Sequence, residues 1–436
     1  MRRKFYILVK YIAETCVKWL PKPGQQARTH LVILYSVTFF LILPTLCHKL
    51  PFSVYYHAGH ADKDDGIRKF NDENDERLKL SRNFLKDTFS SMKRLPNSPL
   101  VTSKLNFPED ALTLFGQPKL KVDIALTIIT VSRNRHKFNN YEPHYLTQAV
   151  WRYMELLLSS ENRQRNVKLS LCNVDRDPDT YHETRNLSSF IQTFQRFPTK
   201  SSYSFEVFEK EKEDYVYCLN ASLVWKPSFV LLVEDDSLPT NDMFRVLYHV
   251  LDYIYHVKNQ HGSYQHFPEQ WYLKLYHPDR LLGYWSIEVE RIPELISLSL
   301  VFGVLVLLIY RCIGMKNVFR NINASWFLLS LYFFLLFIAI GRQNLLEFRR
   351  LSKHFYMLTP SPSCCTPAIL YTNATAKTVI DYLSHVRCKS RFAKDMALEQ
   401  LRSETHLKAY LLQPNLFKHI GLYSSLRSKI LSPGVV

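Results

Sequence analysis

The segment FVLLVEDDSLP, residues 229–239, decides the fold prediction. Its five apolar residues are followed by three consecutive carboxylates, Glu234, Asp235 and Asp236, and then by Pro239. A short apolar run that stops before a proline is typical of a buried strand. Adjacent carboxylates repel one another unless a cation lies among them, and hard divalent cations bind such oxygens. Because ligands of α/β proteins bind at the carboxyl ends of strands, the segment predicts a metal site. The alternative is a solvated acidic turn.

This arrangement resembles the Asp-X-Asp motif of nucleotide-sugar-dependent glycosyltransferases of the GT-A type. In these enzymes the motif follows a buried strand and holds a manganese ion against the diphosphate of a sugar nucleotide. The resemblance implies an α/β catalytic domain, and the other parts of its site must come from elsewhere in the chain.

Length and composition set the first limits. The 436 residues suffice for one large catalytic domain with appendages. The net charge of +17 favours acidic partners such as diphosphates or anionic headgroups. No zinc-finger spacing or RNA-binding motif is present, so nucleic acid is not expected as a partner. The eight cysteines show no metal-ligand spacing, which favours disulfides over zinc.

The N-terminal part predicts a membrane anchor. Residues 1–30 are basic, and residues 31–48 are almost entirely apolar, close to the ~20 residues that span a bilayer. There is no cleavage site for a signal peptide, so we predict a cytosolic tail and a signal anchor. The positive-inside rule then places the following chain in the lumen. Residues 49–121 are polar, with apolar residues at helical spacing, and predict a helical luminal stem. The alternative for the apolar run is a buried core helix.

Residues 122–291 alternate between strand-like and helix-like segments. We predict strands at 123–131, 167–174, 229–233 and 271–276, and helices at 145–158, through 218–223, and at 243–257. This alternation predicts the first part of an α/β domain with a largely parallel sheet. Arg133 at a strand end and Lys212 before a helix are candidates to bind phosphate or uracil. Solvated surface cations are the alternative for both.

Residues 292–341 predict a transmembrane hairpin. The runs 296–310 and 326–340 are apolar and uncharged, and the link between them carries Arg311, Lys316 and Arg320 without an acid. A luminal domain before the hairpin makes this link cytosolic, and its positive charge agrees with that orientation. The alternative is a pair of core helices.

Residues 342–436 predict the second part of the α/β domain. We expect a turn entering a strand at 364–371, helices at 376–386 and from 394, and a strand at 409–412. In an oxidising lumen we expect Cys172 to pair with Cys218, and Cys388 with Cys364 or Cys365. The luminal sequons begin at Asn186, Asn220 and Asn373, and the sequon at Asn323 lies on the cytosolic link.

Two C-terminal residues complement the acidic segment. His419 follows a predicted strand, and a neutral imidazole suits Mn²⁺ better than Mg²⁺. Asp395 stands at the start of a helix, where inverting GT-A enzymes place a general base. A satisfied histidine and a helix-start acid stabilised by the helix dipole are the alternatives.

Six sequence blocks resemble the Golgi family of post-GPI-attachment N-acetylgalactosaminyltransferases. They read FEKEKEDYVYCL, FVLLVEDDSLP, WYLKLYHPDRL, CCTPAIL, FAKDMAL and PNLFKHIGLYSSLR. The last block is also similar to the end of the N-acetylglucosaminyltransferase IV family. The segment around Asp395 is similar to the base-bearing segment of fringe-type transferases.

The resemblance implies a Golgi enzyme that transfers GalNAc from UDP-GalNAc, with inversion, onto the first mannose of the glycan of GPI-anchored proteins. It implies Mn²⁺ held by Asp236 and His419, and Asp395 as the general base. Glu234 and Asp235, with Lys212 and Arg133, are the expected donor-binding residues. The candidates for the acceptor side are Lys274, Tyr276 and His277.

Two other functions fit parts of the sequence. A GlcNAc transferase acting on N-glycans would have the same fold and tail, but a soluble acceptor does not require a membrane hairpin. A membrane-anchored sugar-binding protein without catalysis would not require the acidic segment, Asp395 and His419 together. A transporter is disfavoured because the three apolar runs carry no ionisable side chain for an ion path.

Overall fold

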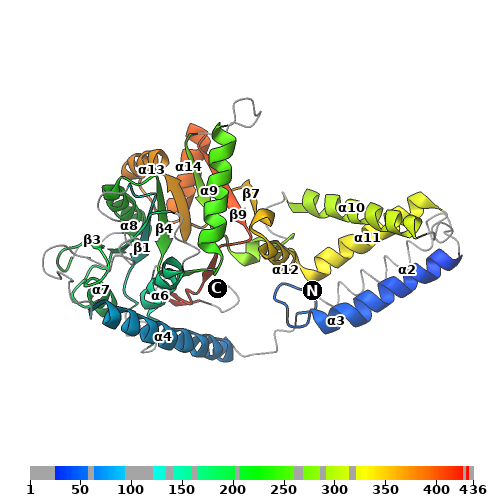
Figure 1. Cartoon of the computed structure of the whole chain (residues 1–436), viewed down its shortest axis with the longest axis horizontal. Helices are drawn as coiled ribbons and strands as arrows, with labels where there is room; N and C mark the ends of the chain where they lie inside the picture. Colours follow the sequence, from blue (N-terminus) through cyan, green and yellow to red (C-terminus); the bar gives the residue numbers. More distant parts are fainter. Residues whose placement is uncertain are drawn as a thin grey trace. The chain divides into compact units, whose positions relative to one another are not determined.

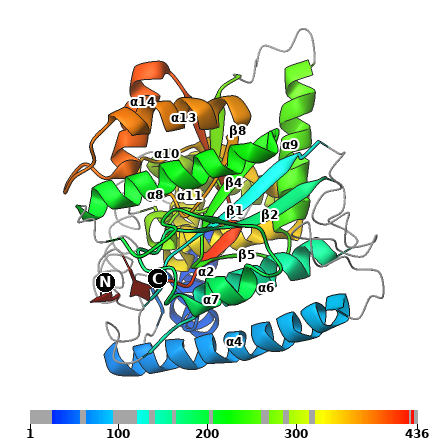
Figure 2. The same cartoon turned by 90° about the vertical axis from the view of Figure 1, so that its left-hand side faces the viewer.

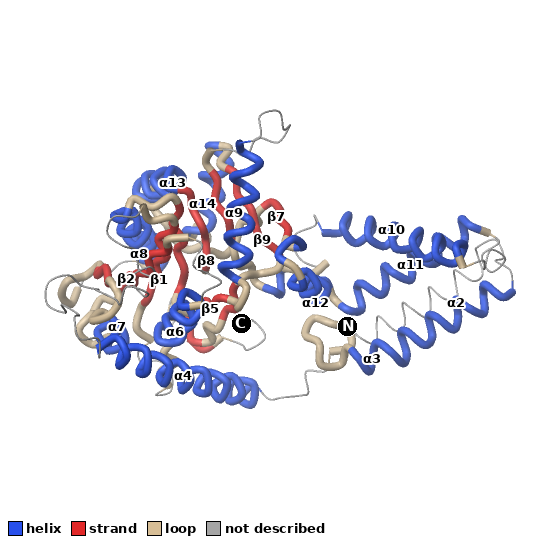
Figure 3. The backbone as a smooth tube through the Cα atoms, viewed as in Figure 1, coloured by secondary structure: helices blue, strands red, loops and turns tan. Residues whose placement is uncertain are grey.

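The computed structural model describes residues 25–56, 63–93, 121–133, 141–159, 165–201, 206–259, 269–284, 291–313, 321–425 and 429–431. The chain divides into two units. The helical unit comprises Met1–Ala61 and Asp279–Ser352, and the α/β unit comprises Asp62–Pro278 and Lys353–Val436. Within the described residues all strands belong to the α/β unit (Figure 3).

The α/β unit is built on an eight-stranded sheet with the order β3-β2-β1-β4-β8-β6-β9-β7 among the described strands. The strands are β1 (Ile124–Thr130), β2 (Val167–Asn173), β3 (Thr193–Gln195), β4 (Phe229–Glu234), β6 (Trp271–Lys274), β7 (Met357–Pro360), β8 (Ala368–Thr372) and β9 (Lys408–Gln413). The pairings show that only β7 and β8 oppose the common direction. The predicted α/β fold with a mostly parallel sheet is therefore confirmed.

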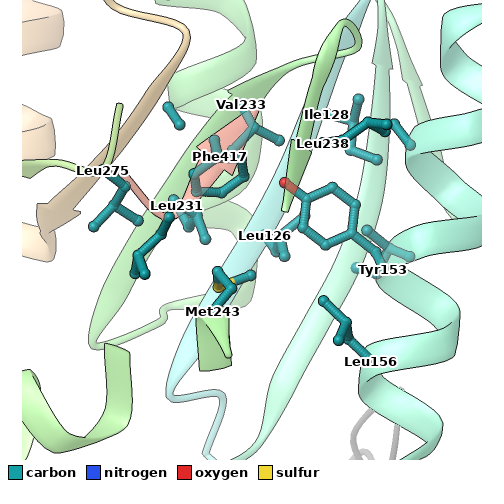
Figure 4. Close-up of a cluster of buried hydrophobic side chains, with 14 of the residues drawn as sticks. Leu126, Ile128, Tyr153, Leu156, Leu231, Val233, Leu238, Met243, Leu275 and Phe417 are labelled. Carbon is teal, nitrogen blue, oxygen red and sulfur yellow. The ribbon is translucent and has the colours of Figure 1, made fainter. Parts of the chain in front are cut away.

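Helices cover both faces of this sheet. One face packs against α6 (Tyr145–Leu158) and α9 (Met243–Asn259), and the other against α8 (Val207–Ser222), α13 (Asn373–His385) and α14 (Lys394–Thr405). Figure 2 shows α13 and α14 on one side of the strands and α6 on the other. Figure 4 shows the first core, where Leu126 and Ile128 of β1 lie near Leu231 and Val233 of β4. The strands are buried because both faces are covered, which explains their nearly continuous apolar sequences.

Beyond the end of β4, a two-stranded sheet brings the C-terminal segment back to the acidic residues. It pairs β5 (Ser237–Pro239) with β10 (Phe417–His419) in antiparallel register, with His419 opposite Ser237. The chain after β10 is also attached here, because the Ile420 N–H donates to the Asp236 carbonyl oxygen at 2.8 Å. Residues almost two hundred positions apart in sequence are thus neighbours.

The polar segment after the anchor contains a long helix, α4 (Lys63–Lys93), as its apolar spacing predicted. This helix packs against the α/β core instead of standing apart. The Asn74 amide donates to the Tyr141 hydroxyl at 2.8 Å, and the Tyr423 hydroxyl donates to Asn71 at 2.9 Å. Within the predicted stem, α4 therefore belongs to the α/β unit, whereas the described residues 49–56 belong to the helical unit.

The helical unit contains three helices that are long and apolar enough to cross a membrane. They are Thr29–Leu46, which combines the later part of α2 (Gln25–Val37), a π-helical turn (Thr38–Ile42) and α3 (Leu43–Leu46), then α10 (Arg291–Cys312) and α11 (Ile322–Ile340). Figure 1 shows α10 and α11 side by side within this unit. The Tyr35 hydroxyl donates to the Leu328 carbonyl oxygen at 2.8 Å, and the Thr38 and Tyr332 hydroxyls lie 2.9 Å apart. These polar contacts join the first helix to α11, as side-chain hydrogen bonds often do between membrane helices. The presence of three such helices supports the conclusion that the chain is a membrane protein.

The cysteine predictions have mixed outcomes. The Cys172–Cys218 disulfide is confirmed, and it joins β2 to α8, the helix that covers it. The expected bond from Cys388 to Cys364 or Cys365 is wrong. Cys388 is fully buried, and its backbone N–H donates to the Glu209 carboxylate at 2.7 Å. Its sulfur packs in the apolar core beneath α8 and α13, so packing replaces cross-linking there.

Candidate active site

The acidic segment lies where the parallel strands β1 and β4 end. Ile129 is opposite Glu234 in this pair, so the residues that follow β1 lie beside the three carboxylates. The Asp235 N–H donates to the Ile129 carbonyl oxygen at 3.1 Å. Because the side chains beyond both strand ends face the same edge of the sheet, they form one cluster.

Arg133 is the cation that this register brings to the cluster. Its guanidinium is 9% exposed, hydrogen-bonds Asp235, and lies 3.2 Å from Asp236 Oδ2. The Thr130 hydroxyl donates to the same Asp235 oxygen at 2.6 Å. Burial raises the pKa of Asp235 to about 6, although Arg133 opposes this shift. Arg133 therefore lies in the predicted site, but its contacts there are with the Asp235 and Asp236 carboxylates.

Asp236 and His419 lie together on the other side of Arg133. The distance from Asp236 Oδ2 to His419 Nε2 is 3.6 Å, and the imidazole stacks on the Tyr276 ring. Burial by itself raises the pKa of Asp236, but His419 and then Arg133 reverse the shift and lower it to about 2. Burial lowers the pKa of His419, but the Asp236 carboxylate outweighs burial and raises it. The ionised Asp236 carboxylate and the protonated His419 imidazole therefore stabilise each other, with Asp236 buried and His419 half-buried.

The same pair fits a divalent metal ion. Asp236 Oδ1 is buried and has no hydrogen-bond partner within the described chain, as an oxygen reserved for a ligand would be. The separation of 3.6 Å is too long for a hydrogen bond, yet both atoms can bind one ion. A donor set of one imidazole and carboxylate oxygens suits Mn²⁺.

Gly421 completes this part of the site, and the sequence analysis did not identify it. A Cβ atom at this position would lie 2.3 Å from Asp236 Oδ2 and 2.8 Å from His419 Nε2. Real Cβ atoms do not approach other atoms so closely, so only glycine leaves both side chains in place. The His-Ile-Gly sequence was the available signal, but the contact between Gly421 and Asp236 is visible only in the fold.

Lys394 is a second residue that the sequence analysis missed. Its ammonium is 4% exposed and lies 3.0 Å from Glu211 Oε1 and 3.3 Å from Glu234 Oε1. It also lies over the Tyr215 ring, 4.6 Å from the centroid. Lys394 thus connects the first residue of α14 to the acidic segment and to α8. Buried lysines are almost always paired, but the sequence does not say with which acids.

Asp395 follows Lys394 and is held at the start of α14. Its Oδ1 accepts a hydrogen bond from the Met396 N–H at 3.0 Å, and its Oδ2 lies 3.5 Å from the Cys365 backbone nitrogen. Asp395 is partly exposed, so a substrate can reach its carboxylate. The Lys394 ion pairs connect the helix that carries Asp395 to the acidic segment.

The remaining predicted residues have other partners. Lys212 is buried in α8 and lies 2.9 Å from Glu209, and no described contact joins it to the carboxylates after β4. The Lys274 ammonium donates to three carbonyl groups of residues 362–364. His277 is fully buried, and its backbone exchanges two hydrogen bonds with the Asn415 side chain. Among the described contacts of these three acceptor-side candidates, one reaches the Asp236–His419 pair: the Tyr276 ring stacks on the His419 imidazole.

A second group of possible metal ligands lies near the start of α6. Glu142, His144 and Glu183 have ligand atoms within 4.8 Å of one another. His144 Nδ1 lies 3.6 Å from Glu183, and Thr147 donates two hydrogen bonds to the Glu183 carboxylate. Both Thr147 hydrogen bonds go to Glu183 Oε1, whereas Oε2 lies 3.6 Å from His144 Nδ1, so this group is a second candidate for a metal ion beside Asp236 and His419.

The chain matches the model of a known protein family. A family model described as GPI-N-acetylgalactosamine transferase PGAP4 matches residues 124–418. The matched segment covers more than half of the chain, begins at the first residue of β1 and includes the acidic segment, the hairpin and Asp395. It ends one residue before His419.

We expect Gly421→Ala to weaken binding of Mn²⁺, because the new methyl group must displace Asp236 or His419. A loss of about 10–100-fold is typical when residues that orient metal ligands are changed. Calorimetric titration of the purified protein with Mn²⁺ measures this. The control is Gly283→Ala, whose Cβ meets only the flexible end of Gln343 at 3.0 Å. Wild-type affinity in a folded Gly421→Ala protein would contradict the assignment of these ligands.

Proposed function

The chain belongs to the GPI-N-acetylgalactosamine transferase family, and from this premise we propose that it adds β-linked GalNAc from UDP-GalNAc to the first mannose of the GPI glycan on GPI-anchored proteins in the Golgi. The observation that carries the proposal is the Asp236–His419 pair, in which Asp236 is buried with an Oδ1 that has no hydrogen-bond partner within the described chain, and His419 is half-buried. Asp395 lies at the start of α14, which Lys394 connects to the same acidic segment. A sugar nucleotide, a metal and a general base are the parts that this reaction requires.

The topology is the basis for proposing the GT-A type. Strands β3, β2, β1 and β4 run parallel, and the acidic segment follows β4. This arrangement supports the proposal that a nucleotide binds at the carboxyl ends of these strands. The small β5–β10 sheet supports a metal site made from one residue on each side of the hairpin. Both features match the expectation from the Asp-X-Asp motif.

Asp236 and His419 are the proposed Mn²⁺ ligands. When bound, this ion would supply positive charge for the diphosphate of the departing UDP. Tyr276 stacks on His419 and fixes the plane of its imidazole ring. Gly421 leaves the space that both ligands occupy.

Arg133 and the other two carboxylates are proposed to bind the donor. Arg133 neutralises Asp235 and Asp236, so the edge of the sheet is less repulsive to a diphosphate than three acids alone would be. Glu234, held by Lys394, and Asp235, held by Thr130, are in fixed positions to accept hydrogen bonds from sugar or ribose hydroxyls. Lys212 has the weakest support among the donor candidates because its ammonium is paired with Glu209.

Asp395 is the proposed general base. It would accept the proton of the mannose hydroxyl as that oxygen attacks the anomeric carbon from the face opposite UDP, which gives inversion. Partial exposure admits the acceptor, and the Met396 N–H orients the carboxylate. The product proton stays on Asp395 until solvent removes it.

The hairpin is proposed to bring this chemistry to a lipid-linked acceptor. The α/β unit continues into the helical unit at Pro278 and returns at Lys353, so the chain ties it to candidate membrane helices on both sides of the interruption. The GPI acceptor is itself fixed in the membrane. Confining both partners to one surface raises their effective concentration, which an enzyme for soluble glycans does not need.

The direct test is transfer by the purified full-length protein. Incubated with Mn²⁺, a GPI-anchored acceptor and UDP-GalNAc, it should add one N-acetylhexosamine to the released GPI glycan, as seen by mass spectrometry. UDP-GlcNAc in the same assay distinguishes the rival GlcNAc transferase. Binding of UDP-GalNAc without any transfer would support the non-catalytic sugar-binding protein.

Substitutions of the proposed metal ligand Asp236 and of the proposed base Asp395 should have different effects on donor affinity and on kcat. Asp236→Ala removes a proposed ligand, so donor affinity and turnover should fall together. Asp395→Asn keeps the shape but cannot accept a proton, so donor binding should survive while kcat falls by about 10²–10⁴-fold. Donor titration in the presence of Mn²⁺ and GalNAc incorporation measure the two quantities. Near-normal kcat in Asp395→Asn would place the base elsewhere, with Asp235 as the first substitute.

The proposed topology is a cytosolic N-terminus, three spans and a luminal α/β unit. Asn186 and Asn220 are exposed, so both sequons should carry glycans. The Asn373 amide donates to the Pro227 carbonyl oxygen at 2.9 Å, and Asn323 lies in the first turn of α11, so neither should be modified. Glycopeptide mass spectrometry, with protease protection in sealed microsomes, checks this. A glycan at Asn323 would overturn the three-span model.

The hairpin should be needed for membrane-borne acceptors only. The Arg342–Glu294 ion pair, at 2.9 Å, closes the base of the hairpin. A short polar linker between Leu295 and Ala339 keeps this pair and removes the apolar helices. We expect UDP-GalNAc binding to persist and transfer to GPI in membranes to be lost.

The matched control for this variant replaces the same segment with two unrelated apolar helices of equal length, which should restore transfer. Full transfer to membrane-borne GPI by the linker variant would contradict this role and would mean that the hairpin is only an additional membrane anchor. Transfer to a detergent-soluble GPI glycan by the linker variant shows that its catalytic centre is intact.

A further inference from the structure

Two adjacent cysteines lie in the turn before β8. The Sγ atoms of Cys364 and Cys365 are 2.7 Å apart. Non-bonded heavy atoms rest about 3.5–4.0 Å apart, so these sulfurs are closer than packing alone allows. Both side chains are partly buried, and within the described chain neither has a disulfide to another cysteine.

The backbone of this turn is shaped for a cross-link between neighbours. Cys365 has φ of 72°, in the left-handed region that residues with a Cβ seldom adopt. Such a conformation persists only where the surroundings enforce it. Here it turns the two consecutive side chains toward each other, although successive side chains of an extended chain point to opposite sides.

The turn is held from two sides. The Lys274 ammonium donates to the carbonyl oxygens of Pro362 at 2.7 Å, Ser363 at 3.3 Å and Cys364 at 2.9 Å. On the other side, the Cys365 backbone nitrogen lies 3.5 Å from Asp395 Oδ2. The turn therefore links a lysine buried at the end of β6 to the carboxylate at the start of α14.

We propose that Cys364 and Cys365 form a vicinal disulfide, and that this ring positions the Cys365 N–H against Asp395. The positioning part rests on the function proposed above for Asp395. The ring restricts the turn to one backbone conformation, because a disulfide between neighbouring residues limits the torsion angles of both residues and of the peptide bond that joins them. The N–H then stays directed at the carboxylate.

The chemistry of closure is thiol–disulfide exchange. The hydrogen bond from the Cys365 thiol, with His277 and Lys274 nearby, lowers the pKa of Cys364 to about 5 against the effect of burial. The Cys364 thiolate attacks a small-molecule disulfide such as oxidised glutathione and releases one thiolate. The Cys365 thiol then loses its proton and attacks Cys364 Sγ, which releases a second glutathione thiolate. Two thiols are oxidised, and one glutathione disulfide is reduced.

The other described cysteines of the α/β unit offer no competing partner. Cys172 and Cys218 are bonded to each other. Cys388, the partner expected from the sequence, is buried in the core beneath α8 and α13. An oxidising lumen, as proposed for the α/β unit, maintains such a bond.

Peptide mapping of the purified full-length protein tests the bond directly. The protein is denatured and alkylated with iodoacetamide before any reduction, and then digested. We expect the peptide that holds both cysteines to be unalkylated and two hydrogens lighter than the dithiol peptide. After reduction it should take up two alkyl groups. Alkylation of both thiols before reduction, or a peptide cross-linked to Cys388, would overturn the proposal.

The positioning role has its own test. Mild reduction of the native protein, with peptide mapping to show that Cys172–Cys218 remains closed, should lower kcat several-fold and leave donor KM unchanged. The Cys364→Ser/Cys365→Ser double variant should show the same lowered kcat and no further response to reductant. Unchanged kcat after the vicinal bond opens would overturn the positioning role.

Cys388→Ser is the matched control, and it should keep both the wild-type mass pattern and the response to reductant. Failure of the proposed function is distinguishable, because a wild-type protein that transfers no GalNAc can still carry the disulfide in the mass experiment.

Discussion

The burial of two consecutive carboxylates, Asp235 and Asp236, beside the half-buried Glu234 is the constraint that organises this protein. Each acid lies beside a basic side chain from another part of the chain: Glu234 beside Lys394, Asp235 beside Arg133, and Asp236 beside both Arg133 and His419. An uncompensated buried charge is strongly destabilising, so none of these cations can leave without penalty. The ion pairs therefore bring together the loop after β1, the start of α14 and the strand β10. The candidate active site is a product of this charge balance.

The sequence predicted the parts of the fold that local pattern determines. The apolar runs of β1, β2 and β4, the helices α6 and α9, and the three membrane helices were all visible as periodicity or length. The short strands β3, β7 and β10 were not predicted, because three or four residues carry too little pattern. Their strand character comes from partners elsewhere in the chain.

The candidate site shows the same division. Its acidic residues, Asp395 and His419 could be named from the sequence because their residue types and positions beside strands or helix starts are informative. Lys394 and Gly421 could not, since their roles depend on which atoms they meet: Glu211 and Glu234 for Lys394, and Asp236 for Gly421. The expectation for Cys388 failed for this reason too, because its position in an apolar core is a property of the folded chain.

The order of strands has a consequence for biogenesis. In the sheet, β8 lies between β4 and β6, although the ribosome makes β4 and β6 before the hairpin and β8 after it. The first half of the α/β unit therefore emerges with three unpaired strand edges, one on β4 and both on β6, which only the second half can fill. In the proposed topology, insertion of only one helix of the hairpin would leave β8 and β9 on the other side of the membrane, and the sheet could not close. In that topology, completion of the α/β fold would report correct membrane integration, and misinserted chains would present open strand edges to chaperones.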